Sequence, residues 1–120
     1  MLKDTNFIQS KTFDHAVHIV QLVQHLQNTF HDFVLSKQLL RSGTSIGANV
    51  RESKNAQSRA DFASKLNIAL KEADETEYWL ELLYATEYLS KENFEPIYNE
   101  NKFIIAVLTK IIKSLKEGKE

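Results

Sequence analysis

The most constraining feature of this chain is an alternation of four- and three-residue steps between apolar or small residues, sustained over three heptads. Its members are Phe62, Leu66, Ala69, Ala73, Thr76, Leu80 and Leu83. Side chains spaced in this way lie on one face of an α-helix and form the seam along which helices pack. The repeat predicts a long helix over about residues 58–89, with Ser58 as its N-cap and Asp61 completing a variant of the capping box.

Two segments before this repeat also show helical periodicity. A helix is predicted over about residues 13–30, and another over about residues 32–54. The core-facing stripe expected for the first consists of Phe13, Ala16, Val17, Val20, Val23 and Leu26. That expected for the second consists of Leu35, Leu39, Ser42, Ile46 and Asn49. Gly43 and Gly47 each cost about 1 kcal/mol of helix propensity relative to alanine, so they indicate close approach of a neighbouring backbone.

A last helix is predicted over about residues 91–117, with Ser90 as its N-cap. Its stripe consists of Ile97, Asn101, Ile104, Leu108, Ile111 and Leu115. Because proline removes a helical hydrogen bond, we expect Lys91–Glu95 to form a separate turn and the main helix to begin near Pro96. Four amphipathic helices with short connections favour an all-α fold, an antiparallel up-and-down four-helix bundle that forms a single domain over residues 1–120.

Composition narrows the class of protein. Three glycines and one proline in 120 residues argue against a turn-rich β fold. The chain has no cysteine, which excludes disulfides and thiolate metal sites. No segment approaches the roughly 20 apolar residues that span a bilayer, and residues 1–10 lack the apolar stretch of a signal peptide. We therefore expect a cytoplasmic protein without a membrane segment.

Charge is nearly balanced in sum but unevenly distributed along the chain. Residues 33–71 carry a net charge of +5 and residues 72–100 a net charge of −8, within a total of −1. Such polarity can guide a subunit to its own copy, basic face to acidic face. The alternative interpretation is that both stretches are solvated helix faces.

Motifs for catalysis or metal binding are not evident. His15 and His18 lie one helical turn apart without a third ligand in sequence, and Gly43 and Gly47 lack the lysine and strand of a phosphate-binding loop. The carboxylates Glu72 and Glu75 have no companion base nearby in the pattern, which favours a structural role over acid–base catalysis. We expect no enzyme activity, no metal and no cofactor.

Small and polar residues interrupt the core-facing pattern between Leu40 and Ser53. Buried polar groups there require hydrogen-bond partners, and a buried Arg41 would need a carboxylate such as Glu72 or Glu75. Two interpretations stay open: a polar network that fixes helix register, or a contact with another subunit or a ligand. The residues assigned to this network are Arg41, Ser45, Asn49, Glu52, Glu72 and Glu75.

Two stretches carry a resemblance to a known family. The first is Arg41-Ser42-x-x-Ser45-Ile46-x-x-Asn49-Val50-x-Glu52. The second is Asp61-Phe62-x-x-Lys65-Leu66-x-Ile68-Ala69-Leu70-x-Glu72-x-x-Glu75-Thr76-x-Tyr78-Trp79-Leu80. Their order and spacing resemble the four-helix-bundle proteins related to those encoded in intervening sequences of 23S ribosomal RNA, over about residues 10–116.

The resemblance implies a homo-oligomer, most simply a ring of five bundles, in a family whose molecular function is largely unassigned. A branch that is similar in fold, the accessory variability protein of diversity-generating retroelements, forms a pentameric barrel and binds a reverse transcriptase and nucleic acid. That protein is strongly basic, whereas this chain has a net charge of −1. Phosphate neutralisation by clustered Lys and Arg supplies most non-specific nucleic-acid affinity.

Two function hypotheses from different classes follow. The first is a non-enzymatic oligomeric scaffold that recruits a protein partner, for which surplus aromatics on several faces of the 58–89 helix are candidate contacts. These aromatics are Tyr78, Trp79, Tyr84 and Tyr88, which can also simply pack within the bundle. The second is a nucleic-acid-binding accessory protein. Its candidate basic patch consists of Lys37, Arg51, Lys54 and Arg59, together with Arg41 where that side chain is not committed to an intramolecular pair.

Overall fold

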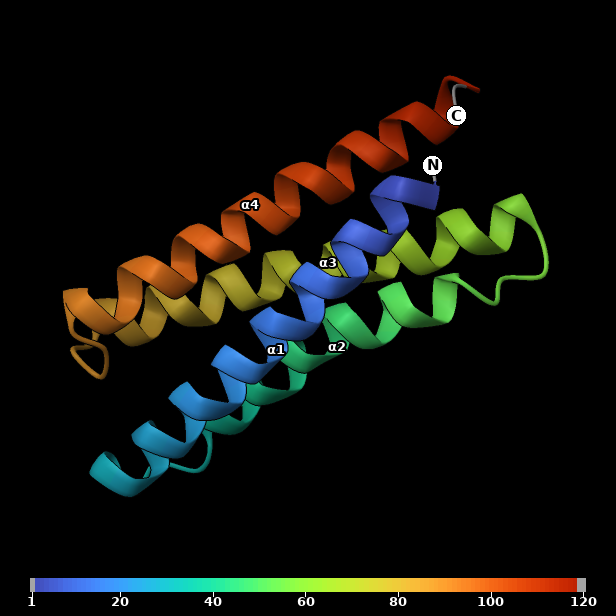
Figure 1. Ribbon diagram of the computed structural model, residues 1–120. Helices are drawn as coiled ribbons and strands as arrows, with labels where there is room; N and C mark the ends of the chain where they lie inside the picture. Colours follow the sequence, from blue (N-terminus) through green and yellow to red (C-terminus); the bar gives the residue numbers. More distant parts are fainter. Residues whose placement is uncertain (1, 119–120) are drawn as a thin grey trace.

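The computed structural model describes residues 2–118 and shows four α-helices joined by short turns (Figure 1). They are α1 (Leu2–Phe30), α2 (Leu35–Ser53), α3 (Arg59–Ala85) and α4 (Lys91–Lys116). Successive helices run in opposite directions and pack side by side, and α1 also packs against α4. The all-α, up-and-down four-helix bundle predicted from the sequence is confirmed. The outer ends of the predicted 1–120 domain, residue 1 and residues 119–120, lie outside the described residues.

The interior consists of two hydrophobic clusters that follow one another along the bundle. One is centred on Ile46, Leu66 and Ile104, and the other on Leu39, Leu80 and Ile97. All seven residues of the α3 repeat are buried, and so are all six residues of the stripe predicted for α4. The four–three spacing therefore identified the core faces of these two helices correctly.

The stripe predicted for α1 is wrong in part. Phe13, Val17 and Val20 are exposed by 55%, 39% and 36%, although Val23 and Leu26 are buried. The face that meets the core instead contains two polar residues, Thr12 and His15, each with no exposed surface. Their hydrogen bonds remove the cost of burial, so a pattern of apolar residues alone selected a neighbouring face. The helix also begins at Leu2 rather than near Phe13.

The second helix begins at Leu35, three residues later than predicted. The backbone N–H of Ser36 donates to the Asp32 carboxylate at 3.0 Å, and the Ser36 hydroxyl donates to the Asp32 carbonyl at 2.6 Å. These bonds hold Asp32 in the turn, and His31 before it has a positive φ of 56°. A Cβ added to Gly43 would lie 2.8 Å from the Ile19 side chain, so the predicted close approach of a neighbouring helix at the glycines is confirmed.

The third helix starts where predicted, because the Ser58 hydroxyl accepts a hydrogen bond from the Asp61 N–H at 3.0 Å. It ends at Ala85, four residues before the predicted end. Glu87 has a positive φ of 67°, its N–H donates to the Tyr84 carbonyl, and the Tyr88 N–H donates to the Leu83 carbonyl. This pair of bonds is the Schellman motif, which stops a helix even without glycine.

The fourth helix is continuous from Lys91 to Lys116, so the separate turn expected before Pro96 is wrong. Ser90 caps it as predicted, accepting from the Asn93 N–H at 3.1 Å. Pro96 is exposed, as is Glu92, whose carbonyl would have accepted the missing N–H. Loss of one hydrogen bond on the solvent side is tolerated because water replaces the donor.

Candidate functional site

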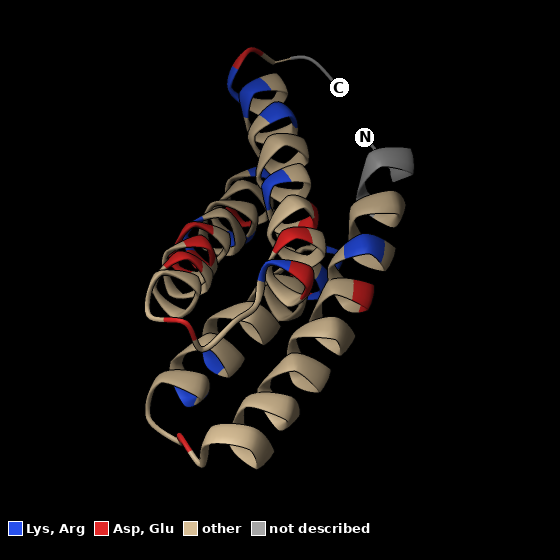
Figure 2. Cartoon of the chain, turned by 90° about the vertical axis from the view of Figure 1, so that its left-hand side faces the viewer, with Lys and Arg blue, Asp and Glu red and all other residues tan. Residues whose placement is uncertain are grey.

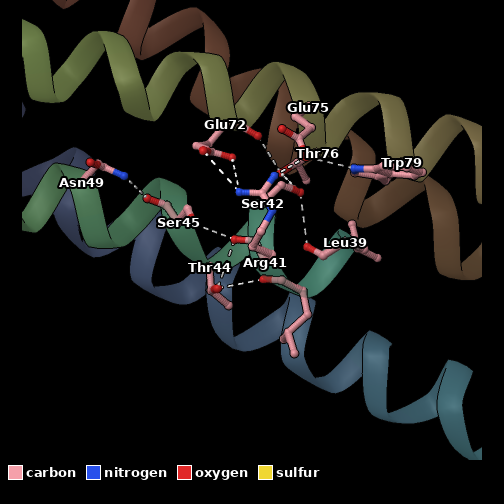
Figure 3. A network of polar contacts seen from close by, with 11 residues as sticks. Leu39, Arg41, Ser42, Thr44, Ser45, Asn49, Glu72, Glu75, Thr76 and Trp79 are labelled. Atoms are coloured by element: carbon pink, nitrogen blue, oxygen red, sulfur yellow. Dashed lines mark hydrogen bonds and ion pairs between the residues drawn. The ribbon is translucent and has the colours of Figure 1, made fainter. Parts of the chain in front are cut away.

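The surface where α2 meets α3 carries a polar network centred on Arg41 (Figure 3). The Arg41 Nη1 donates to Glu72 Oε1 at 3.1 Å, and its Nη2 donates to Glu75 Oε2. Glu75 also accepts from the indole N–H of Trp79 at 3.2 Å. The Arg41 side chain is 47% exposed, which differs from the buried arginine considered above. One guanidinium thus holds two carboxylates of α3 at the surface.

The pKa of Glu75 is lowered, chiefly by the hydrogen bond from Arg41 and then by that from Trp79. The pKa of Arg41 is raised in turn, first by its bond to Glu75. Both groups are therefore charged at neutral pH. Because both are substantially exposed, solvent screening limits the stability that this pair contributes.

Three other residues assigned to this network are not joined to it through their side chains. The Ser45 hydroxyl donates to the Arg41 carbonyl at 2.6 Å, and the Asn49 amide donates to the Ser45 carbonyl at 2.8 Å, both within α2. Glu52 pairs separately with Lys65 of α3 at 3.0 Å. Asn49 is only half-buried. The residue of α2 that faces the core at this point is its neighbour Val50. The polarity of Asn49 is satisfied inside its own helix and does not fix the register between helices.

The four candidate interface aromatics differ in their surroundings. Tyr78 is the most exposed, at 57%, and its ring lies edge-on to the half-buried Trp79 ring at 5.0 Å. Tyr84 is 40% exposed and stacks on Phe94 at 4.2 Å. Tyr88 is half-buried and meets Phe30 edge-on at 5.0 Å. Tyr84 and Tyr88 thus pack between helices, whereas Tyr78 projects beside the Arg41 network.

The candidate basic residues do not form one patch. Lys37 lies in the first turn of α2, whereas Arg51 lies in its last turn, about 21 Å further along at 1.5 Å per residue. Arg59 donates to the Leu115 carbonyl at 3.3 Å, which places the start of α3 against the end of α4. The end of the bundle that contains Arg51, Lys54 and Arg59 is its basic end. Three lysines of α4 add to it, and the sequence pattern did not single them out. They are Lys110, Lys113 and Lys116 (Figure 2).

A second polar network, missed in the sequence, joins α1 to α4. The buried His15 approaches Glu100 Oε1 through Nδ1 at 2.5 Å and Asn101 Oδ1 through Nε2 at 2.9 Å. Asn101 is fully buried and donates to the Ala73 carbonyl of α3 at 3.0 Å. The exposed His18 also contacts Glu100, at 3.0 Å. A polar residue in the core stripe of α4 was the available signal, because a buried amide requires partners.

Hydrogen bonding constrains the proton on His15. The Asn101 amide nitrogen must face the Ala73 carbonyl, which can only accept, so Asn101 Oδ1 accepts from His15 Nε2. Burial, the largest influence, raises the pKa of Glu100, but the bonds from His15 and His18 together outweigh it and lower the pKa. Glu100 Oε1 lies within hydrogen-bonding distance of His15 Nδ1, on the other side of the ring from Asn101. The α1–α4 contact therefore encloses a hydrogen-bonded network of His15, Glu100 and Asn101.

This second network does not suit metal binding, since both His15 nitrogens are already engaged. Among the side chains that the structure describes, no group of three or more His, Asp or Glu residues could hold a metal ion. A groove of about 450 Å³ lies beside the network between α1 and α4. It is lined in part by His18, Leu22, Pro96 and Glu100.

Comparison with known proteins places the chain in a family. Residues 4–110 match the family model of the 23S rRNA-intervening sequence protein. This match covers most of the chain. The chain belongs to that family. No curated protein matches it.

A solved structure of similar fold supports the assignment. It is that of a protein with unknown function from the S23 ribosomal protein family of Bacteroides thetaiotaomicron VPI-5482. The two chains are 57% identical, the match covers 92% of this chain and 98% of the other, and the TM-score is 0.89. This intervening-sequence family and its structural neighbour have no assigned molecular function. Across residues 2–118, each helix is too short or too polar to cross a membrane.

Proposed function

We propose that this chain is a non-enzymatic scaffold that assembles with copies of itself and docks a protein partner where α2 meets α3. The observation that carries the docking site is the adjacent Arg41, Trp79 and Tyr78 on one surface. Arginine, tryptophan and tyrosine are the residues most enriched among those that dominate binding energy. Tyr78 offers the largest exposed fraction among the α3 aromatics.

Glu75 gives this surface its rigidity, because it accepts hydrogen bonds from both Arg41 and Trp79. Side chains already held in one conformation lose less entropy when a partner binds. The group of Arg41, Glu72 and Glu75 is slightly negative, since Glu72 provides a second carboxylate 3.1 Å from the same guanidinium. A partner that is itself weakly charged and apolar therefore fits this surface better than a polyanion.

Self-assembly is the second part of the proposal, and the family resemblance implies a ring of five copies. The net charge of only −1 leaves little repulsion between copies. The test is the solution mass by light scattering on a sizing column. A mass near five times the 13.8 kDa of one chain supports the ring. A mass of one chain would contradict the assembly.

The docking surface is tested separately by affinity capture with the wild type and two matched variants. Tyr78→Ala should lose a partner that the wild type retains, whereas Tyr84→Ala should keep it, because Tyr84 stacks against Phe94 within the chain. Retention of the same partner by Tyr78→Ala would contradict docking at this surface. Unchanged helix content by circular dichroism is required of both variants.

A second candidate function is nucleic-acid binding, which is favoured by the basic end of the bundle. The cations gathered there are Arg51, Lys54, Arg59, Lys110, Lys113 and Lys116. Binding through phosphate contacts weakens steeply with salt. Filter binding with mixed RNA should then show retention at low salt that falls at moderate salt. Absence of retention at low salt would exclude this function.

A further inference from the structure

The C-terminal half of α1 differs from the rest of the bundle in containing no Lys, Arg, Asp or Glu. From His15 to His31 the sequence contains no Lys, Arg, Asp or Glu, although 15 basic and 16 acidic residues occur in the 120 residues of the chain. Figure 2 shows this half of α1 free of coloured segments, while α3 and α4 carry many. Depletion of charge is the compositional mark of the centre of a protein interface.

The exposed surface of this half of α1 is uncharged but mixed in polarity, since Val17 and Val20 lie beside Gln21, Gln24 and Asn28. Among the side chains of residues 6–118, eleven large hydrophobic ones are exposed, and seven of these lie between Phe7 and Val34. Those on or directly after the uncharged half of α1 that do not pack against another ring are Val17, Val20, Phe33 and Val34, whereas Phe30 meets Tyr88 within the chain. Val34 is exposed by 72% and Phe33 by 57%, values that are unusual for residues in a well-fixed turn.

The turn that presents these side chains is well fixed. The Asp32 carboxylate and carbonyl both bind Ser36, whose hydroxyl also accepts from Gln27 of α1 at 3.2 Å. Towards the other end, a groove of about 390 Å³ continues the face from α1 onto α2. Its lining combines apolar and small residues with one cation and one carboxylate. They are Gln9, Phe13, Ala16, Thr44, Gly47, Ala48, Arg51 and Glu52.

We infer that this α1 face, from Phe13 to Val34 with the adjoining groove, is the surface that a second copy of this chain covers. The inference rests on the proposed self-assembly and names the contact that produces it. The centre of this face, residues 15–31, has no Lys, Arg, Asp or Glu to attract a strongly charged partner, and its charged residues lie at the borders. A copy with a net charge of −1 meets little repulsion at such a surface.

The size of the face also suits a subunit contact. From Phe13 to Val34 it extends about 30 Å, and with α2 beside α1 it is about 20 Å wide, or roughly 600 Å² in projection. The accessible area of a side-chain surface exceeds its projection, so the face approaches the roughly 800 Å² per partner that stable interfaces bury.

Chemical labelling tests this contact directly, because the chain has no cysteine of its own. The Val20→Cys variant places one thiol on the α1 face, and Ala106→Cys places one on the exposed side of α4. In the assembled protein, maleimide should label the first at least tenfold more slowly than the second. After dilution to the single chain, the two rates should become equal.

Solution mass provides the matched mutational test. Val20→Glu should reduce the mass to that of one chain with unchanged helix content, whereas Val20→Thr, which is neutral and of similar shape, should keep the wild-type mass. A wild-type mass of one chain would overturn the proposed assembly itself. An oligomeric wild type whose thiols at positions 20 and 106 react equally fast, or whose mass survives Val20→Glu, would overturn only the contact at α1.

Discussion

The two polar networks of this bundle join different pairs of helices and differ in exposure. Arg41 reaches across from α2 to two α3 carboxylates while nearly half of its side chain faces water. His15 reaches from α1 to Glu100 and Asn101 of α4 with no exposed surface. An ion pair in water contributes little to stability, whereas breaking a buried hydrogen-bonded network leaves an uncompensated group. We therefore expect the buried network to contribute more to stability than the exposed one, which is the proposed docking surface.

The largest expected effect comes from removing the amide that connects α1, α3 and α4. Asn101→Leu keeps the side-chain size but leaves the buried His15 Nε2–H without an acceptor. We expect the free energy of unfolding to fall by about 3 kcal/mol, the cost of an unsatisfied buried donor beside a charge. Urea unfolding followed by circular dichroism measures this change.

The control for this variant is Asn67→Leu, which removes an exposed α3 amide that donates only to the Ala63 carbonyl of its own helix. Its unfolding free energy should stay within about 0.5 kcal/mol of the wild type, as is usual for surface changes. Equal losses from the two variants would contradict the distinction between buried and exposed networks.

The second-largest effect on the free energy of unfolding is expected from acid, which should weaken the buried network. The folded-state pKa of Glu100 is lowered from its ordinary 4.5, so its contribution is complete above that value and is lost as pH falls through the folded pKa. Glu100→Gln should be less stable than the wild type at pH 7, and the difference should shrink below about pH 4.5. Urea midpoints at several pH values measure it.

The exposed carboxylate provides the comparison for this titration. The pKa of Glu75 is also lowered, first by Arg41, so Glu75→Gln should lose stability in the same acid range. Its loss should be smaller, because the Arg41 and Glu75 side chains are 47% and 35% exposed against 0% for His15. A larger acid-dependent difference for Glu75→Gln would reverse the expected order of the two networks.

Sequence periodicity predicted the fold well where the core face is apolar, and less well where it is not. The α3 and α4 stripes are buried at every predicted position. On α1, Thr12 and His15 face the core because hydrogen bonds satisfy them, from Thr12 to the Ile8 carbonyl of its own helix and between His15 and Asn101 of α4. Those partners are 4 and 86 residues away, and a pattern of hydrophobicity contains no information about the second distance.

The polar network centred on Arg41 was also predicted only in part from the sequence. The expectation that a buried Arg41 would need a carboxylate pointed to Glu72 and Glu75, and the structure brings the three together, although Arg41 is 47% exposed. The sequence could not show that Ser45 and Asn49 bond within their own helix. A serine or asparagine side chain reaches the carbonyl one turn earlier as readily as it reaches a residue of a neighbouring helix. The ends of the helices depended on local turn geometry. For example, α3 ends early, at Ala85, because Glu87 adopts a positive φ.

A smaller effect is expected at the centre of the exposed network. Arg41→Gln removes the contacts to Glu72 and Glu75, and we expect the unfolding free energy to fall by no more than about 1 kcal/mol, as for other exposed pairs. Partner capture should fall much more than stability if this surface docks a protein. A stability loss like that of Asn101→Leu, with capture unchanged, would show that Arg41 is structural.

The smallest effect is expected at Asn49, because its amide bonds only to the Ser45 carbonyl one turn earlier. Asn49→Leu leaves that carbonyl with its helical hydrogen bond and adds apolar surface beside the core residues Ile46 and Val50. We expect unchanged solution mass and an unfolding free energy within about 0.5 kcal/mol of the wild type, as for surface changes. A shift in mass with normal helix content would mean that Asn49 contacts another subunit, and would extend the exposed network along α2 beyond Arg41.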